Sequence, residues 1–420
     1  MNPFELQGQD LEALLMNWRQ LTPLPYDKNR VDPYTRTRVI LMNGTEFEAV
    51  GFSHQFQRHS TDNELRRQLA LLRRLEQQQQ KLVSALKPSD ETILEHTIGY
   101  EQLAVDLTAA LAQREDDPYV KQALDFALLE DFDHLYRYAD LMEFDDRVPA
   151  ERLVGRYTEI MPGRPTIAHH RHPYDSVKYP VLNPNASAET RLCTAIITAA
   201  EQQTMNYYMN VASFYPTVYG QRLYREIGMV EEQHVTQYGS LMDASATWLE
   251  CLLDHQYTEC FLYWSAMETE TDPRIKCIWE QLFEQEVAHL HFAANLLREY
   301  EGKEPEQVLQ NPEFPAPLEL TSNIDYVRDV LAGTVCDTAL LEGWIAVSDL
   351  SPEADFFRYQ AIVNNRLEDV ESHTVIERLI ARDGEDYRFE IAPNPIPALR
   401  NRREDNTSIG RDPEENCQPE

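Results

Sequence analysis

The sequence AETRLCTAIITAAEQQTMNYYMNVASFY (residues 188–215) is followed by Pro216 and then by TVYGQRLYREIGMVEEQHVTQYGSLMDAS (residues 217–245). Apolar residues recur at helical spacing in both segments, so we predict two amphipathic helices joined at the proline. Glu201 lies beside the apolar face of the first helix, and Glu231 and His234 share one face of the second. Because Glu201 and Glu231 are equally far from the proline, antiparallel packing brings them level. Three potential metal ligands therefore converge within one helix pair.

A second helix pair with the same spacing is predicted upstream, in residues 91–142. Glu101 lies on its first arm, and Asp131 and His134 lie three residues apart on its second arm. The acid on the first arm precedes the acid on the second by 30 residues, as it does in the pair described above. Aspartate is one methylene shorter than glutamate, so Glu130 stays open as an alternative ligand to Asp131.

A third helix pair is predicted in residues 248–300. Glu259 lies on its first arm, and Glu286 and His289 lie three residues apart on its second. The two arms meet at a turn marked by Asp272-Pro273, because proline rarely continues a helix. These three side chains form half of a second metal site.

The fourth predicted pair, residues 324–381, matches the other half of that site less clearly. Val370 stands where an acid three residues before His373 would be expected. Ligands would therefore come from a shifted register, and two sets stay open: Asp337 with Glu368, or Glu342 with Asp369 and His373.

The alternation of helix pairs with proline-rich connections predicts an all-α protein. A long proline-rich connection separates the first two pairs, as a crossover along a four-helix bundle requires. We therefore expect bundles at residues 91–245 and 246–383, and a disordered polar tail at residues 384–420. Residues 1–90 are expected to be a small extension, with a β-hairpin at Asn43-Gly44 and a charged helix at residues 61–88.

Composition excludes several classes of protein. The chain has 71 acidic and 38 basic residues and a formal net charge of −33, so no basic field is available for nucleic acid or anionic membranes. No signal region and no long apolar run is present, so a cytoplasmic protein is expected. The six cysteines form no Cys-x-x-Cys pair, which argues against zinc knuckles and a rubredoxin-type iron site.

Residues 91–245 resemble the ferritin-like di-iron carboxylate superfamily, which includes ferritins and rubrerythrins. Six residues match the ligand pattern of that family one by one, except that Asp131 replaces the usual Glu: Glu101, Asp131, His134, Glu201, Glu231 and His234. The resemblance implies two tandem ferritin-like four-helix bundles. It also implies two iron ions, or manganese with iron, in the first bundle. For Glu259, Glu286 and His289 in the second bundle, an intact two-metal site and a mononuclear or vestigial site both stay open.

Four ionised carboxylates facing one another in an apolar core repel, and two divalent ions remove that repulsion. By resemblance we expect an oxidoreductase that activates O₂ and oxidises a small organic substrate with an external electron donor. Two alternatives stay open: a rubrerythrin-like peroxidase or ferroxidase, and a metal-stabilised scaffold without catalysis.

Two further groups of residues have open roles. Three tyrosines near the predicted ligands are either redox-active or part of the core: Tyr100, Tyr207 and Tyr208. Three histidines in the connection between the first two pairs form either an outer metal site or lid, or a solvated loop: His169, His170 and His172.

Overall fold

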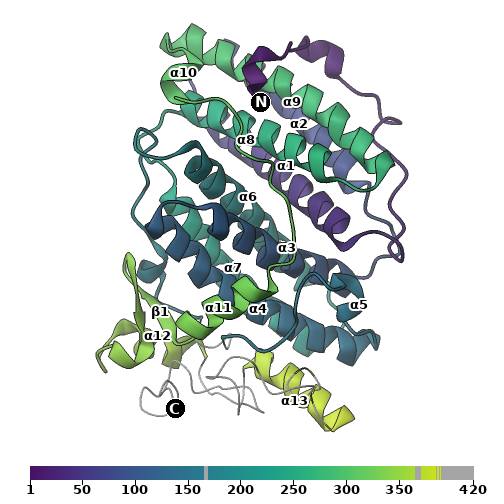
Figure 1. The fold of residues 1–420 in the computed structure, drawn as a ribbon, viewed down its shortest axis with the longest axis vertical. Coiled ribbons are helices and arrows are strands. Elements are labelled where there is room, and N and C mark those ends of the chain that lie inside the picture. Colours follow the sequence, from purple (N-terminus) through teal and green to yellow (C-terminus); the bar gives the residue numbers. More distant parts are fainter. Residues whose placement is uncertain (165–168, 365–369, 385, 387, 389–420) are drawn as a thin grey trace. The chain divides into compact units, whose positions relative to one another are not determined.

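The computed structural model describes residues 1–164, 169–364, 370–384, 386 and 388, and these are mostly helical (Figure 1). Within them, β-structure is limited to one two-stranded antiparallel sheet. The all-α class predicted from the sequence is therefore confirmed. No helix in the described ranges is both long enough and apolar enough to cross a membrane. The predicted disordered tail lies almost entirely outside the described residues.

The chain divides into two compact units, each assembled from separate stretches of sequence. Unit 1 comprises residues 1–91, 180–203 and 242–320, and unit 2 comprises residues 92–179, 204–241 and those from 321 onward. Helix α6 (Ala188–Val211) contributes its residues up to Gln203 to unit 1 and its remaining residues to unit 2. This grouping differs from the contiguous domains expected from the sequence.

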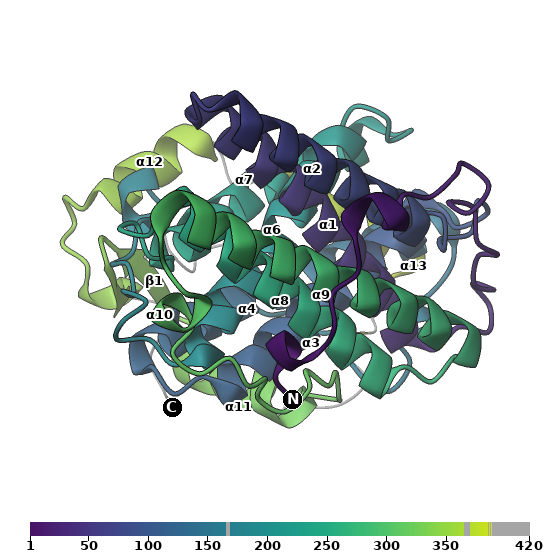
Figure 2. The same ribbon diagram turned by 90° about the horizontal axis from the view of Figure 1, so that it is seen from above.

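Four long helices form the body of unit 1. They are α1 (Pro33–His59), α2 (Asn63–Ser84), α8 (Trp248–Thr269) and α9 (Pro273–Glu301). Helix α1 packs on α2, α8 packs on α9, and the two pairs meet where α1 contacts α8 and α2 contacts α9. Figure 2 shows α8 and α9 running alongside each other. Three short helices complete the unit: η1 (Pro3–Glu5), η2 (Leu11–Leu14) and α10 (Pro305–Val308).

The β-hairpin expected at Asn43-Gly44 is wrong, because these residues lie inside α1. Asp32 caps the helix by accepting a hydrogen bond from the backbone N–H of Tyr34, and Pro33 occupies its first turn. The helix buries residues on most of its circumference, so it lacks the polar stripe by which amphipathic helices are recognised. A Cβ added to Gly44 would lie 2.9 Å from Cβ of Gln203, so this glycine permits close helix packing and does not form a turn.

Unit 2 is built around α3 (Ile93–Arg114), α4 (Pro118–Asp146) and α7 (Val218–Leu241). Helix α13 (Glu371–Asp383) packs on α4 and α7, α11 (Ile324–Thr334) packs on α4, and α5 (Glu151–Val154) packs on α3. The remaining elements are η4 (Pro173–Ser176), β1 (Asp337–Leu340), β2 (Gly343–Ala346), η5 (Val347–Asp349) and α12 (Asp355–Val363).

The fourth predicted helix pair is not formed. Residues 324–363 contain two short helices separated by the β1–β2 hairpin, in which Thr338 pairs with Ile345 and Ala339 with Trp344. Leu341 has a φ of +50° at the turn of this hairpin, a left-handed conformation that ends any helix. The β-branched and aromatic residues on β2 favour a strand over a helix.

The pairs α3–α4 and α8–α9 are closely alike. Helices α3 and α8 each have 22 residues and begin with a capping box at Thr92 and Thr247, respectively. Helices α4 and α9 each have 29 residues and begin with an Asp-Pro pair whose aspartate caps the first turn. The similarity places Asp131 and Glu286 at equivalent positions along α4 and α9.

Candidate metal centres

Unit 2 contains a cluster of ionisable side chains at its centre, which we call the unit 2 cluster. Its members are Glu101 on α3, Asp131 and His134 on α4, and Glu231 and His234 on α7. All five are completely buried. The i and i+3 spacing on α4 and on α7 places each acid and its histidine on one face of the helix, as the sequence predicted.

The ligand atoms of the unit 2 cluster are close together. Those of Glu101, His134 and Glu231 lie within 4.8 Å of one another, and so do those of Asp131, Glu231 and His234. Nδ1 of His134 lies 2.9 Å from Oε1 of Glu231. Nδ1 of His234 lies 3.2 Å from Oε2 of Glu231 and 3.3 Å from Oδ1 of Asp131. Glu231 therefore belongs to both groups.

Glu130 and Asp131 are adjacent in sequence but have different surroundings. Both Glu130 oxygens lie 3.0 Å from Nη1 of Arg171, and Nε2 of His234 lies 2.6 Å from Oε2. Burial alone would raise the pKa of Glu130, but the positive charge of Arg171 and the hydrogen bond with His234 hold this pKa well below its usual range. Neither Asp131 oxygen has a hydrogen-bond donor, and burial raises the pKa of this carboxyl. Asp131 is therefore the better placed ligand.

The connection before α6 adds buried histidines to unit 2. His169 and His170 are 1% and 7% exposed, so a solvated loop is wrong for these two residues. The ring of His169 lies 5.8 Å from that of His134, and neither of its ring nitrogens has a hydrogen-bond partner. Burial lowers the pKa of His169 well below its ordinary value, so this imidazole is neutral and able to bind a metal. His172, which is partly exposed, caps η4 by accepting from the N–H of Tyr174.

Glu201, the sixth predicted ligand, is 1% exposed. It lies on the part of α6 that groups with unit 1, two residues before Gln203. Its role as a ligand stays a prediction.

Unit 1 contains a second buried cluster, which we call the unit 1 cluster. Its members are Glu46 on α1, Glu76 on α2, Glu259 on α8, and Glu286 and His289 on α9. The last three were predicted to form half of a site, and all five are at most 2% exposed. The missing half comes from the region that the sequence assigned to an N-terminal extension.

Glu46 and Glu76 were missed, although a signal for them was available. They are 30 residues apart, the same spacing as in the two predicted pairs that lie between residues 91 and 245. The residue three after Glu76 is Gln79, so a search for acid-x-x-His did not find this pair. The expected β-hairpin also removed Glu46 from any helix.

The alternative partners from the fourth predicted pair do not complete this site. Within the described ranges, Asp337, Glu342 and His373 are not among the side chains whose ligand atoms group with those of Glu259, Glu286 and His289. Glu368 and Asp369 lie outside the described residues.

Burial and mutual repulsion shape the ionisation of the unit 1 cluster. Burial, followed by the charge of Glu286, raises the pKa of Glu76 to about 8. Burial also raises the pKa values of Glu46 and Glu259 well above the usual range, with the neighbouring carboxylates adding to the effect. Without a cation, these carboxyls hold protons at a pH at which exposed ones are ionised.

Both units thus contain a buried carboxylate and histidine cluster that could hold a metal ion. Comparison of the chain with protein-family models, with curated proteins and with solved structures found no match.

Proposed function

We propose that the unit 2 cluster binds two iron ions, or one manganese and one iron, and that the protein is an oxidoreductase that uses O₂ or peroxide. The observation that carries this proposal is the pair of Asp131 and His134. Both Asp131 oxygens and Nε2 of His134 are buried and have no hydrogen-bond partner, although they adjoin other ligand atoms. A purely structural polar cluster would satisfy such atoms. Oxygen-rich ligation with one imidazole on each side suits iron and manganese.

The residues divide naturally between two ion positions. Glu101 and His134 fit one position, Asp131 and His234 fit the other, and Glu231 is common to both. We assign Glu201 as the remaining carboxylate. It is buried, and α6 continues from it without a break to Tyr208, whose hydroxyl donates to Oε1 of Glu101.

When bound, a pair of such redox-active ions supplies one-electron and O₂ chemistry. The chain excludes water from the cluster by burying all five side chains. Arg171 neutralises Glu130, and Glu130 in turn fixes the orientation of His234. Tyr208 holds one oxygen of Glu101 in place.

A run of tyrosines next to Glu101 supports electron entry from an external donor. The ring of Tyr208 lies 5.2 Å from that of Tyr138 and 5.6 Å from that of Tyr207. Tyr207 in turn stacks on Tyr100 with ring centroids 4.5 Å apart. We propose that electrons reach the cluster along these rings, which gives Tyr100, Tyr207 and Tyr208 a role beyond packing.

A cavity of about 780 Å³ in unit 2 supports a small organic substrate. Its walls include Arg171, which contacts Glu130, and Gln233, the neighbour of His234. Arg222, Arg225 and Arg378 also line it, together with Glu226, Glu232 and Glu371, so its wall carries charges of both signs. A cytoplasmic location, and the lack of nucleic-acid and membrane partners, remain predictions from the sequence.

The test is metal analysis of the purified protein combined with measurement of O₂ or peroxide consumption. Glu231→Ala is compared with Glu232→Ala, because Glu232 is the exposed neighbour on the same helix. We expect Glu231→Ala alone to lose two ions per chain together with the activity. O₂ uptake driven by Fe²⁺ alone would favour a ferroxidase, and peroxide consumption in place of O₂ a rubrerythrin-like peroxidase. Metal binding without O₂ or peroxide consumption would favour a scaffold, and no metal loss in Glu231→Ala would contradict the proposal.

A further inference from the structure

The unit 1 cluster consists of two halves that share one carboxylate. Ligand atoms of Glu76, Glu286 and His289 lie within 4.8 Å of one another, and so do those of Glu46, Glu76 and Glu259. The first half contains an imidazole nitrogen, whereas the second contains only carboxylate oxygens. The two halves therefore offer different ligands, unlike those of the unit 2 cluster, where each half includes a histidine.

Two buried glutamines hold the carboxylates of this cluster. Nε2 of Gln79 donates to Oε1 of Glu286 at 2.6 Å. Nε2 of Gln256 donates to Oε1 of Glu76 at 3.1 Å and to Oε2 of Glu259 at 2.7 Å. Gln79 stands three residues after Glu76, the place of a histidine on α4, α7 and α9. An amide there orients a carboxylate but supplies no nitrogen ligand.

The remaining oxygens of these carboxylates lack donors. The buried cluster atoms without a hydrogen-bond partner are Oε2 of Glu46, Oε2 of Glu76, Oε1 of Glu259, Oε2 of Glu286 and both ring nitrogens of His289. Each belongs to a side chain that is at least nine-tenths buried. Leaving so many acceptors unsatisfied is costly, and a cation between them would satisfy them together.

No arginine or lysine neutralises the cluster in the described part of unit 1. Tyr263 donates to Oε1 of Glu46 at 2.5 Å, and Nδ1 of His289 lies 3.0 Å from Oε1 of Glu286. Further contacts come from the two glutamines, from His255, and from Nδ1 of His289, which also lies 3.5 Å from Oε1 of Glu76. This differs from unit 2, where Arg171 balances Glu130. Four buried carboxylates that no arginine or lysine of this part of the chain neutralises are suited to binding divalent ions.

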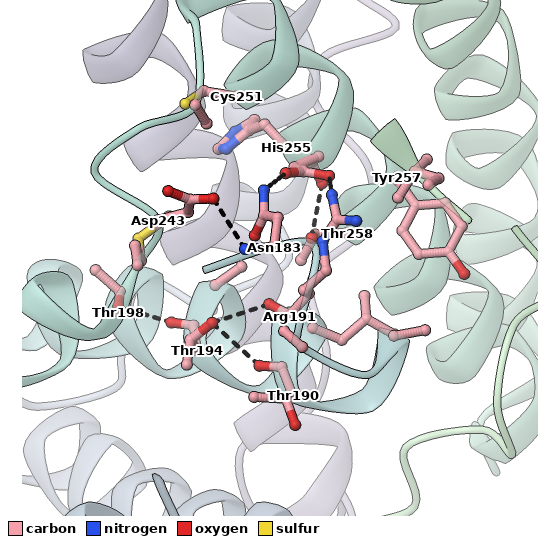
Figure 3. A pocket seen from close by; sticks show the side chains of 18 of the residues that line it. Asn183, Thr190, Arg191, Thr194, Thr198, Asp243, Cys251, His255, Tyr257 and Thr258 are labelled. Atoms are coloured by element: carbon pink, nitrogen blue, oxygen red, sulfur yellow. Dashed lines mark hydrogen bonds and ion pairs between the residues drawn. The ribbon is translucent and has the colours of Figure 1, made fainter. Parts of the chain in front are cut away.

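Unit 1 also contains a cavity of about 320 Å³, and Figure 3 shows His255 and Thr258 among the side chains that line it. Its lining includes Thr45 and Thr258, which immediately precede Glu46 and Glu259. His255, also on its wall, has Nε2 3.7 Å from Oε1 of Glu259. None of the five cluster residues lines the cavity, but His255 links its wall to Glu259.

We propose that unit 1 holds its own two-ion centre with unlike positions. Glu76, Glu286 and His289 bind an ion that accepts a nitrogen ligand, such as Fe²⁺. Glu46, Glu76 and Glu259 bind a hard divalent cation such as Mn²⁺, which enters through the cavity. Hard, all-oxygen ligation suits manganese and magnesium, whereas imidazole suits iron and zinc. This centre is independent of the function proposed for unit 2.

The experiment is Mn²⁺ titration of the metal-free, full-length protein, with free Mn²⁺ followed by electron paramagnetic resonance. Wild-type protein is expected to bind more than two ions per chain, because unit 2 accounts for at most two. Saturation below two ions per chain would overturn the proposal, and if saturation occurs at two, the variants below decide whether those ions are bound in unit 1.

Variants then assign the extra ions. Glu46→Gln is expected to lose one Mn²⁺, and Glu76→Gln is expected to lose two because Glu76 belongs to both halves. Glu48→Gln is the matched control, since Glu48 lies on the same helix and lines the cavity outside the cluster. Asp131→Asn tests unit 2 separately. In the double variant, the Mn²⁺ lost through Asp131→Asn should add to the Mn²⁺ lost through Glu46→Gln. Unchanged Mn²⁺ binding in folded Glu46→Gln and Glu76→Gln would mean that protons, not metal ions, neutralise the cluster.

Discussion

His234 donates from Nε2 to Oε2 of Glu130 at 2.6 Å, and this bond turns Nδ1 toward Asp131 and Glu231. Glu130 also accepts from Arg171, so it is ionised and the proton of the shared bond belongs to the histidine. The other ring nitrogen then carries the lone pair that a metal ion needs.

Removing the charge of Glu130 and removing that of its neighbour Asp131 are therefore expected to have opposite effects on the stability of the metal-free protein. Glu130→Gln leaves Arg171 buried without its partner and should lower the free energy of unfolding by about 3–5 kcal/mol. Asp131→Asn removes repulsion with Glu231, so the metal-free protein should be at least as stable as wild type while the metal content falls. Denaturant unfolding of the metal-free proteins and metal analysis test both parts. Equal destabilisation by the two substitutions would refute the different roles assigned here.

Alanine substitutions at two glycines of α1, Gly44 and Gly51, are expected to change the stability of unit 1 in opposite directions. A Cβ at Gly44 would lie 2.9 Å from Cβ of Gln203, whereas a Cβ at Gly51 meets nothing within 4 Å. Gly44→Ala should destabilise unit 1 by about 1–3 kcal/mol through overpacking. Gly51→Ala should stabilise it by about 0.5–1 kcal/mol, because alanine favours a helix. Thermal unfolding monitored by circular dichroism compares them, and a stabilising Gly44→Ala would show that α1 and α6 pack less closely than described.

The metal-free protein should lose stability as pH rises because of Glu76. Its pKa is about 8 when folded and has an ordinary value of 4.5. Between these values the folded state keeps a proton that the unfolded chain has released, so the free energy of unfolding falls with increasing pH. One full proton corresponds to about 1.4 kcal/mol per pH unit.

Glu76→Gln provides the comparison, since other groups titrate in the same range. With chelator present, the stability of wild type relative to this variant should fall between pH 5.5 and pH 8. A difference that is constant across this range would show that Glu76 does not hold a proton in the folded state.

Replacing the tyrosines next to Glu101 tests the proposed electron route. Tyr208→Phe and Tyr207→Phe keep the ring contacts but remove the phenolic hydroxyls that a redox-active tyrosine requires. Both variants should keep their metal and consume O₂ about tenfold more slowly or worse, equivalent to about 1.4 kcal/mol in the barrier. Slowing in Tyr208→Phe alone would limit the effect to the hydrogen bond with Glu101, and full activity in both would exclude the route.

The ligand spacing in unit 2 could be predicted from local sequence. Glu101, Asp131, His134, Glu231 and His234 lie on the expected helices, because i and i+3 periodicity and proline-marked turns are local properties. Sequence could not choose between Glu130 and Asp131. That choice depends on Arg171, which approaches from the connection 41 residues away.

Which helices pack together to form unit 1 could be learned only from the tertiary structure. Helix α1 is buried on most sides and carries Asn43-Gly44, so its pattern imitated a hairpin, and only packing against α6 explains the glycine. The sequence assigned residues 324–381 as the partner of α8 and α9, but a strand hairpin separates the short helices α11 and α12 in that segment.

The sequence by itself determined the helical class, most helix ends and the residue types able to bind metal, because these depend on periodicity, capping and side-chain chemistry within a few turns. Only the folded chain decided that Glu46 and Glu76 join Glu259 and Glu286. Such a pairing depends on the complementarity of buried surfaces more than 150 residues apart in the chain, which no local pattern records.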